Sequence, residues 1–122
     1  MSELQNTGSP MVAAVLLSQV GGSVQTAELV LEEFVSQTPI DVANIEKALA
    51  ADDLVAAGKV AHSLKGASGV FGANQLRQFA ADLEMLARAN EKAQSEEMFA
   101  KLKAEATRCL DFIPEFKTLL NQ

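Results

Sequence analysis

Hydrophobic residues recur in steps of three and four along most of the chain, and this periodicity constrains its fold more than any other feature. One stripe runs over residues 27–49, a second over 54–71, a third over 76–86 and a fourth over 98–120. Steps of three and four place side chains on one face of an α-helix. No segment alternates apolar and polar residues as a strand does, and hairpin dipeptides such as Asn-Gly are absent. The sequence therefore predicts an all-α protein, an antiparallel four-helix bundle.

Capping residues predict a short additional N-terminal helix before the bundle. Ser9 would be its N-cap and Pro10 its first helical residue, because proline lacks the N–H that this position leaves unpaired. Gly21-Gly22 would end this helix, and Ser23 would cap the long helix that follows.

The length and composition fit a single folded domain. A chain of 122 residues can bury roughly 65% of its unfolded surface, and an apolar content of 48% is too high for a disordered protein. Residues 1–8 are polar, so we expect a flexible N-terminal segment there and a bundle domain over residues 9–122.

Polar residues and prolines predict how the long helices are divided. Pro39 would kink or split the first, because its ring clashes with the preceding turn. Asp52-Asp53 would end the first helix and cap the second, and residues 72–74 would form a tight connection to the third. The acidic stretch 95–97 would begin the last helix, which Pro114 would bend.

The charge of the chain argues against a nucleic-acid partner. Its 10 Lys and Arg residues are outnumbered by 16 Asp and Glu residues, and no basic residue precedes Lys47. Proteins that hold phosphate backbones use clustered Lys and Arg. The longest apolar run, residues 11–17, is too short to cross a bilayer and has no cationic lead. We therefore expect a cytoplasmic protein with neither a nucleic-acid nor a membrane partner.

The single cysteine and the single histidine restrict metal chemistry. Cys109 cannot form an internal disulfide and falls on the last apolar stripe, so we expect it in the core. One histidine, His62, cannot build a His-rich site, and Lys59 stands where the Glu of a Glu-x-x-His pair would lie. These observations predict no metal and exclude di-iron and haem bundles.

His62 is predicted to lie at the edge of the core. It follows the core residue Ala61, so its side chain is rotated by about 100° from the second stripe. Lys65 is its neighbour at i+3 and Gly66 its neighbour at i+4. An imidazole and an ammonium group would therefore stand side by side at the rim of the bundle.

Three glycines lie in this helix although each costs up to ~1 kcal/mol relative to alanine there. Bare surface beside a nucleophile would let a bulky partner bring its reacting group close to His62, which accounts for Gly66 and Gly69. Gly58 has the alternative role of allowing close helix packing.

The next predicted helix brings a carboxylate to the height of His62. If the turn is centred on Ala73, His62 and Glu84 are each eleven residues from it. The handedness of the hairpin decides whether they share a flank, and the sequence fits either hand. On a shared flank, Glu84 would accept a hydrogen bond from Nδ1–H of His62 and leave the Nε2 lone pair outward. Arg77 and Arg88 are alternative partners of Glu84.

The motif His62-x-Leu64-Lys65-Gly66, with Gly72 further along, resembles the signature of histidine-containing phosphotransfer (HPt) domains of bacterial and plant phosphorelays. The resemblance covers about residues 9–120 and includes the order of the helices and the short turn after Gly72.

This resemblance implies that His62 is phosphorylated at Nε2 by the aspartyl phosphate of a receiver domain and passes the group to, or back from, another receiver. Lys65 would position and neutralise the phosphoryl group. Gly66 and Gly69 would keep the approach open. Glu84 would match the Gln or Glu that orients the imidazole in this family.

The resemblance also implies partners and no resident cofactor. The partners would be receiver domains of response regulators or of a hybrid sensor histidine kinase. Mg²⁺ belongs to the receiver in this family, so the chain would be a phosphoryl carrier and not an enzyme. We expect no autokinase activity, because 122 helical residues leave no room for a nucleotide-binding domain. A monomer with transient contacts fits a relay component.

An alternative interpretation retains the predicted fold but not the phosphorylation of His62. A helical bundle of this kind could dock a response regulator without being phosphorylated. The intact set of His62, Lys65 and Gly66 favours the carrier over the docking module.

Overall fold

The computed structural model describes residues 8–122, and all the regular structure in this part is helical. The expectation of a flexible segment over residues 1–8 therefore lies, except for Gly8, outside the described residues. The helices are α2 (Ala13–Gln19), α3 (Val24–Ala50), α4 (Leu54–Val70), α5 (Asn74–Arg88), α6 (Lys92–Asp111) and α7 (Ile113–Leu120). The prediction of an all-α fold is confirmed.

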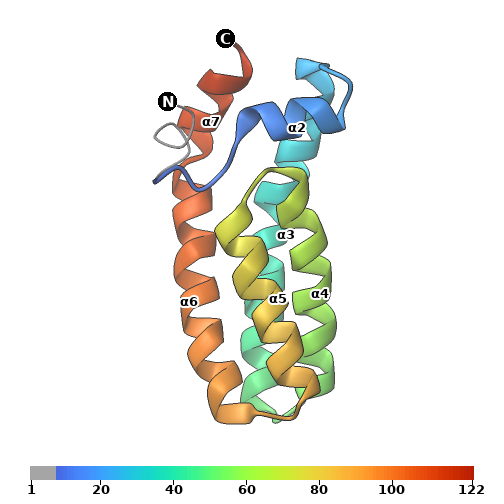
Figure 1. Cartoon of the computed structure of the whole chain (residues 1–122), viewed down its shortest axis with the longest axis vertical. Helices are drawn as coiled ribbons and strands as arrows, with labels where there is room; N and C mark the ends of the chain where they lie inside the picture. The colour runs from blue at the N-terminus through green and yellow to red at the C-terminus, as the bar shows by residue number, and fades with distance from the viewer. Residues whose placement is uncertain (1–7) are drawn as a thin grey trace.

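The four long helices form an antiparallel bundle (Figure 1). α3 and α5 each pack against both α4 and α6, so the face built by α4 and α5 is opposite the face built by α3 and α6. The short helix α2 lies across one end of the bundle, and α7 continues beyond α6 at that same end (Figure 1).

The predicted apolar stripes fill the core, with one shift in α5. Most stripe residues of α3, α4 and α6 are buried. In α5, however, Phe79 and Leu86 are only half-buried, whereas Ala80 and Ala87 are buried. The small side chains face inward because α4 approaches closely there: a Cβ on Gly58 would lie 3.6 Å from Cβ of Ala87. Gly58 therefore serves packing.

Two predicted N-caps are confirmed. The Ser23 hydroxyl accepts a hydrogen bond from the backbone N–H of Thr26 at 3.1 Å. The Asp53 carboxylate accepts one from the N–H of Ala56 at 3.0 Å. Each side chain satisfies a donor that the first helical turn leaves unpaired.

The predicted start of the N-terminal helix is wrong. Ser9 and Pro10 precede the helix, which begins at Ala13 with Val12 as its N-cap. Pro10 is buried, and the N–H of Val12 donates to the carbonyl of Phe71 at 3.0 Å. Contacts with the end of α4 therefore hold this segment out of the helix.

The predicted start of the last long helix is also wrong. α6 begins at Lys92, with Glu91 as its N-cap, three residues before Ser95. Asn90 adopts φ 61° and the N–H of Glu91 returns to the carbonyl of Leu86, so α5 closes tightly and the next helix starts at once. Ser95 is buried within the first turns of α6.

The two prolines inside predicted helices behave differently. α3 runs as one helix through Pro39 without a split. Because proline has no N–H, position 39 donates no hydrogen bond to the carbonyl of Val35. Val35 and Pro39 are both exposed, so water can reach that carbonyl. Near Pro114 the predicted bend is a break between α6 and α7 at Phe112, which leaves Pro114 in the first turn of α7.

The turn between α4 and α5 depends on Gly72. Its φ of 61° favours glycine, and a Cβ there would lie 2.9 Å from Cβ of Val12. The N-terminal segment thus packs directly on this turn. The turn fixes the register of the α4–α5 hairpin, on which the candidate site depends.

Among residues 8–122, no single helix is long and apolar enough to span a bilayer; the pair α2 and α3 passes such a test only when taken together across a 109° bend.

Candidate functional site

His62 and Glu84 face each other across the α4–α5 hairpin. His62 lies in the middle of α4 and Glu84 in the C-terminal half of α5, at the same distance in sequence from Ala73. The two helices lie side by side along their lengths (Figure 1). The hairpin has the hand that puts both side chains on one flank, a choice that the sequence left open.

The Glu84 carboxylate joins three nitrogen groups. Oε2 of Glu84 is 2.9 Å from Nδ1 of His62. Oε1 accepts a hydrogen bond from Nζ of Lys65 at 2.8 Å. Nη2 of Arg88 lies 2.7 Å from Oε2, the same oxygen that contacts the histidine. One carboxylate therefore links the imidazole to two cations.

Exposure separates the members of this cluster. The side chain of Glu84 is 7% exposed, whereas that of His62 is 60% exposed. Lys65 is intermediate, at 33%. The carboxylate is thus held inside the bundle while the histidine ring reaches into solvent.

The pKa of Glu84 is lowered from its ordinary value. The hydrogen bond from Lys65 is the largest cause; burial opposes it, and the hydrogen bond to His62 and the positive charge of Arg88 lower the pKa further. Glu84 is therefore ionised at neutral pH and accepts hydrogen bonds from its neighbours.

A carboxylate at Nδ1 fixes the tautomer of a neutral histidine. Because ionised Glu84 can only accept, the proton of neutral His62 must lie on Nδ1. Nε2 then carries the lone pair, and it has no hydrogen-bond partner among residues 8–122. The arrangement presents an accessible nitrogen nucleophile with a buried anion behind it.

The surface next to the imidazole is open. A Cβ on Gly66 would meet no atom within 4 Å. A Cβ on Gly69 would lie 3.4 Å from Cδ of Arg77, so Gly69 borders the long side chain of Arg77. A shallow hollow of about 320 Å³ lies on the other side of the cluster and is lined by Lys65, Ala81, Glu84, Met85 and Arg88.

The sequence predicted part of this cluster. The contact between His62 and Glu84, predicted for the case that both lie on one flank, is present. Arg88, predicted only as an alternative partner, binds Glu84 together with His62. Arg88 could have been found as the residue at i+4 from Glu84. The ion pair between Lys65 and Glu84 was also missed, because Lys65 was expected to face only the incoming group.

Two other groups do not join the cluster. Gln78 on α5 donates a hydrogen bond to Asp82. Cys109 lies in the core, as predicted. Burial raises the pKa of its thiol to about 12, so the thiol is neutral and unreactive. Among residues 8–122, no three His, Cys, Asp or Glu side chains are grouped to hold a metal ion.

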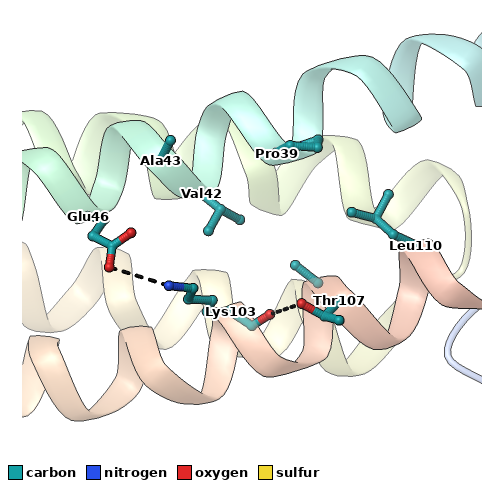
Figure 2. A pocket seen from close by; sticks show the side chains of 8 residues that line it. Pro39, Val42, Ala43, Glu46, Lys103, Thr107 and Leu110 are labelled. Carbon is teal, nitrogen blue, oxygen red and sulfur yellow. Dashed lines mark hydrogen bonds and ion pairs between the residues drawn. The ribbon is translucent and has the colours of Figure 1, made fainter.

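A second hollow lies on the opposite face of the bundle. It encloses about 220 Å³ between α3 and α6 and is lined by residues that include Pro39, Val42 and Leu110 (Figure 2). An ion pair of 3.4 Å between Lys103 and Glu46 spans it (Figure 2). It contains no group of the His62 cluster and is therefore separate from it.

Comparisons with known proteins agree with this geometry. The family model described as Hpt domain matches residues 29–112, which is more than half of the chain. No curated protein matches the sequence.

Two solved structures share the fold. Histidine-containing phosphotransfer protein B (HptB) from Pseudomonas aeruginosa PAO1 is similar at 25% identity with a TM-score of 0.81, over 92% of this chain and 98% of that one. The HPT domain of a sensor hybrid histidine kinase from Shewanella is similar at 21% identity with a TM-score of 0.77, over 93% and 96%.

Proposed function

The chain belongs to the Hpt domain family, whose members carry phosphoryl groups in phosphorelays, and we propose that His62 is the residue that carries the group here. The phosphoryl group would come from the aspartyl phosphate of a receiver domain and pass to, or back from, another receiver. Receivers of response regulators or of a hybrid sensor histidine kinase would be the partners.

The observation that supports this proposal is the orientation of the His62 ring. Nδ1 faces the buried carboxylate of Glu84 at 2.9 Å, while the ring is 60% exposed. A histidine held at one nitrogen and open at the other can act as a nucleophile without reorganisation.

The transfer step conserves atoms and charge. The Nε2 lone pair attacks the phosphorus of the aspartyl phosphate, a P–N bond forms, and the P–O bond to the aspartyl group breaks. The receiver carboxylate leaves with the bonding electrons. The imidazole becomes positively charged and keeps its proton on Nδ1, where Glu84 stabilises the new charge at 2.9 Å.

Lys65 and Gly66 would act on the incoming group. Lys65 stands one helical turn from His62, and its three N–H donors can serve Glu84 and a phosphoryl oxygen together. Gly66 leaves open space beside the His62 ring, and Gly69 does so in part, so the receiver surface can approach the ring.

The chain would supply no cofactor and no kinase activity. The receiver would bring Mg²⁺, and the chain would be a phosphoryl carrier without autokinase activity. We further propose that the chain acts in the cytoplasm. We also propose that it is a monomer with transient contacts, because a relay component has to release each partner.

The test is label transfer from a phosphorylated receiver. A receiver carrying ³²P and Mg²⁺ is mixed with the wild-type chain, with His62→Gln and with Ser63→Ala. We expect acid-labile, alkali-stable label on the wild type and on Ser63→Ala, and none on His62→Gln, with unchanged helical circular dichroism in all three.

A different result would support the docking module. If receivers bind the wild-type chain but leave no label on it, the bundle docks a regulator without being phosphorylated, and the carrier proposal is wrong.

A further inference from the structure

We propose that Arg88 is a positioning residue that keeps the imidazole of His62 neutral, so that Glu84 orients the ring without also protonating Nε2. This inference rests on the proposed function, because Nε2 needs its lone pair to attack a phosphoryl group. It gives Arg88 a role in transfer beyond the pairing of a buried carboxylate.

A carboxylate beside a histidine has two opposed effects. The contact of 2.9 Å between Oε2 of Glu84 and Nδ1 of His62 sets the tautomer of the neutral ring. The same negative charge also favours the positively charged ring. In that form both ring nitrogens carry protons, so Nε2 has no lone pair and cannot accept a phosphoryl group. The site therefore needs positive charge that offsets Glu84.

The charged groups that face His62 supply this offset. On α4, Lys59 and Lys65 lie one helical turn before and one turn after the histidine. On α5, Glu84 contacts the ring and Arg88 contacts Glu84. Cations therefore outnumber the single carboxylate of this cluster, and a charged imidazole would add one more positive charge.

The other helices that pack on α4 add no charge at the ring. The helix α2 carries no charged side chain. On α3, Glu33 and Asp41 line a hollow together with Ala67 and Val70 of α4, on the side of α4 that faces α3. Within residues 8–122, the carboxylate that pairs with His62 is that of Glu84. The balance at the ring is thus set by α4 and α5.

Arg88 is the cation that acts on the same oxygen as the histidine. Its Nη2 lies 2.7 Å from Oε2 of Glu84, whereas Lys65 binds the other oxygen, Oε1, at 2.8 Å. The guanidinium group and the imidazole are therefore within two hydrogen-bond lengths of each other. Because a guanidinium group stays protonated in proteins, it opposes a second positive charge on the ring at every pH.

The packing of α4 on α5 gives Arg88 access to this place. Gly58 has no side chain, and a Cβ there would lie 3.9 Å from Cγ of Arg88. The Arg88 side chain is 67% exposed while Glu84 is buried, so the guanidinium group covers the carboxylate from the solvent side. Replacing Arg88 therefore changes the charge at the site without opening the core.

The first test measures the protonation of His62 in the unphosphorylated chain by the ¹⁵N shifts of the ring. At a fixed pH of about 6.5, an ordinary histidine is half protonated. In Arg88→Met we expect the ratio of protonated to neutral His62 at this pH to rise about 3- to 10-fold, since a close but solvent-screened positive charge is removed. Arg88→Lys keeps the charge and should stay within twofold of the wild type.

Two further variants separate charge from structure. Arg88→Gln keeps a donor for Oε2 but removes the charge, so it should show the same rise, and it keeps the test decisive if Arg88→Met does not fold. Arg108→Met is the matched control: Arg108 also pairs with a buried carboxylate, that of Glu105 at 3.0 Å, but outside the His62 cluster. Its ratio should stay within twofold of the wild type.

The second test measures single-turnover transfer from a phosphorylated receiver at saturating concentration. Because only the neutral ring attacks, the rate of Arg88→Met divided by that of the wild type should be about 3- to 10-fold lower at pH 6 than at pH 8. Division by the wild-type rate removes the pH dependence of the receiver itself. A purely structural role of Arg88 would lower this quotient equally at both pH values.

The outcomes distinguish this inference from the proposed function. If the wild type accepts label and the protonated fraction of His62 is the same in the wild type, Arg88→Met and Arg88→Gln, the inference about Arg88 alone is overturned. A fall in the protonated fraction on removal of Arg88 also overturns it. If the wild type accepts no label from any receiver, the carrier function is overturned, and with it the role of Arg88 in transfer.

Discussion

Glu84 is the residue through which the site is organised. It is nearly as buried as the core, yet it carries a charge that three neighbouring nitrogen groups share. A buried carboxylate is costly unless it is paired, and here Lys65 and Arg88 provide the pairing. The same pairing leaves one hydrogen bond of Glu84 for His62. The stability of the buried charge and the orientation of the imidazole therefore both depend on Glu84.

Removing the charge of Glu84 should slow transfer. Glu84→Gln keeps the shape but weakens the hydrogen bond to the positively charged imidazole that forms on attack. Hydrogen bonds to charged groups contribute about 1.5–3 kcal/mol, so we expect a rate about 10- to 100-fold lower in single-turnover transfer. Glu105→Gln is the control, because Glu105 is also buried and, within residues 8–122, forms its ion pair with Arg108, away from the His62 cluster. Equal rates in Glu84→Gln and wild type would contradict this role.

The cations around Glu84 should set its pKa in a definite order. Lys65 is the largest cause of the lowered pKa, and Arg88 contributes less. We expect Lys65→Met to raise the pKa of Glu84 more than Arg88→Met does, as measured by the carboxyl ¹³C shift during an acid titration. The reverse order would show that Arg88 is the dominant partner.

The sign of the stability effect follows from the same shift. Because the folded pKa of Glu84 is below 4.5, its contribution to stability is complete above pH 4.5 and is lost as the pH falls through the folded value. As the pH falls from 4.5 through the folded pKa of Glu84, the free energy of unfolding should decrease less in Lys65→Met than in the wild type. Chemical denaturation at several pH values measures this difference.

At the scale of elements, the register of the α4–α5 hairpin brings the residues of the site together. Gly72 sets the turn, and the turn brings His62 and Glu84 level. Two glycines on this hairpin have opposite structural roles: a Cβ on Gly72 has no room, whereas a Cβ on Gly66 meets nothing within 4 Å.

A large side chain at Gly66 should block transfer without harming the fold. In Gly66→Leu we expect the free energy of unfolding to stay equal or rise by up to ~1 kcal/mol, because glycine is the poorer helix former. We expect transfer from the receiver to fall by more than 10-fold. Parallel losses of stability and transfer would contradict the role of Gly66 as an open approach.

Gly72→Ala should have the opposite profile. Its φ of 61° and the 2.9 Å approach to Val12 both oppose a side chain. Strain of this kind costs about 1–3 kcal/mol, so urea denaturation should show that loss. Phosphorylation of the folded fraction should remain. A fully stable Gly72→Ala protein would mean that the turn relaxes easily.

The sequence predicted those features that depend on local chemistry. Ser23 and Asp53 were correct because an N-cap is decided within one helical turn. Ser9 and Ser95 were wrong because packing against the end of α4 and closure of α5 decide where those helices start. The same limit applies to the site: register predicted that His62 and Glu84 lie at one height, but only the packed hairpin shows that they share a flank and that Arg88 contacts the same oxygen.

At the scale of the whole molecule, the His62 cluster and the hollow between α3 and α6 lie on different faces of the bundle. The His62 cluster belongs to α4 and α5, and the hollow in Figure 2 belongs to α3 and α6. The cluster is complete before any partner binds, because the contacts of Glu84 are all within this chain. We therefore expect the bundle to carry a phosphoryl group without rearrangement.

The most direct measurement is ¹⁵N and ³¹P NMR of the whole chain after it is phosphorylated by a receiver. We predict one phosphoryl group on Nε2 of His62, a proton retained on Nδ1, and backbone shift changes confined to α4 and α5 near the site. A phosphoryl group on Nδ1 or on another residue, or shift changes throughout the bundle, would contradict it.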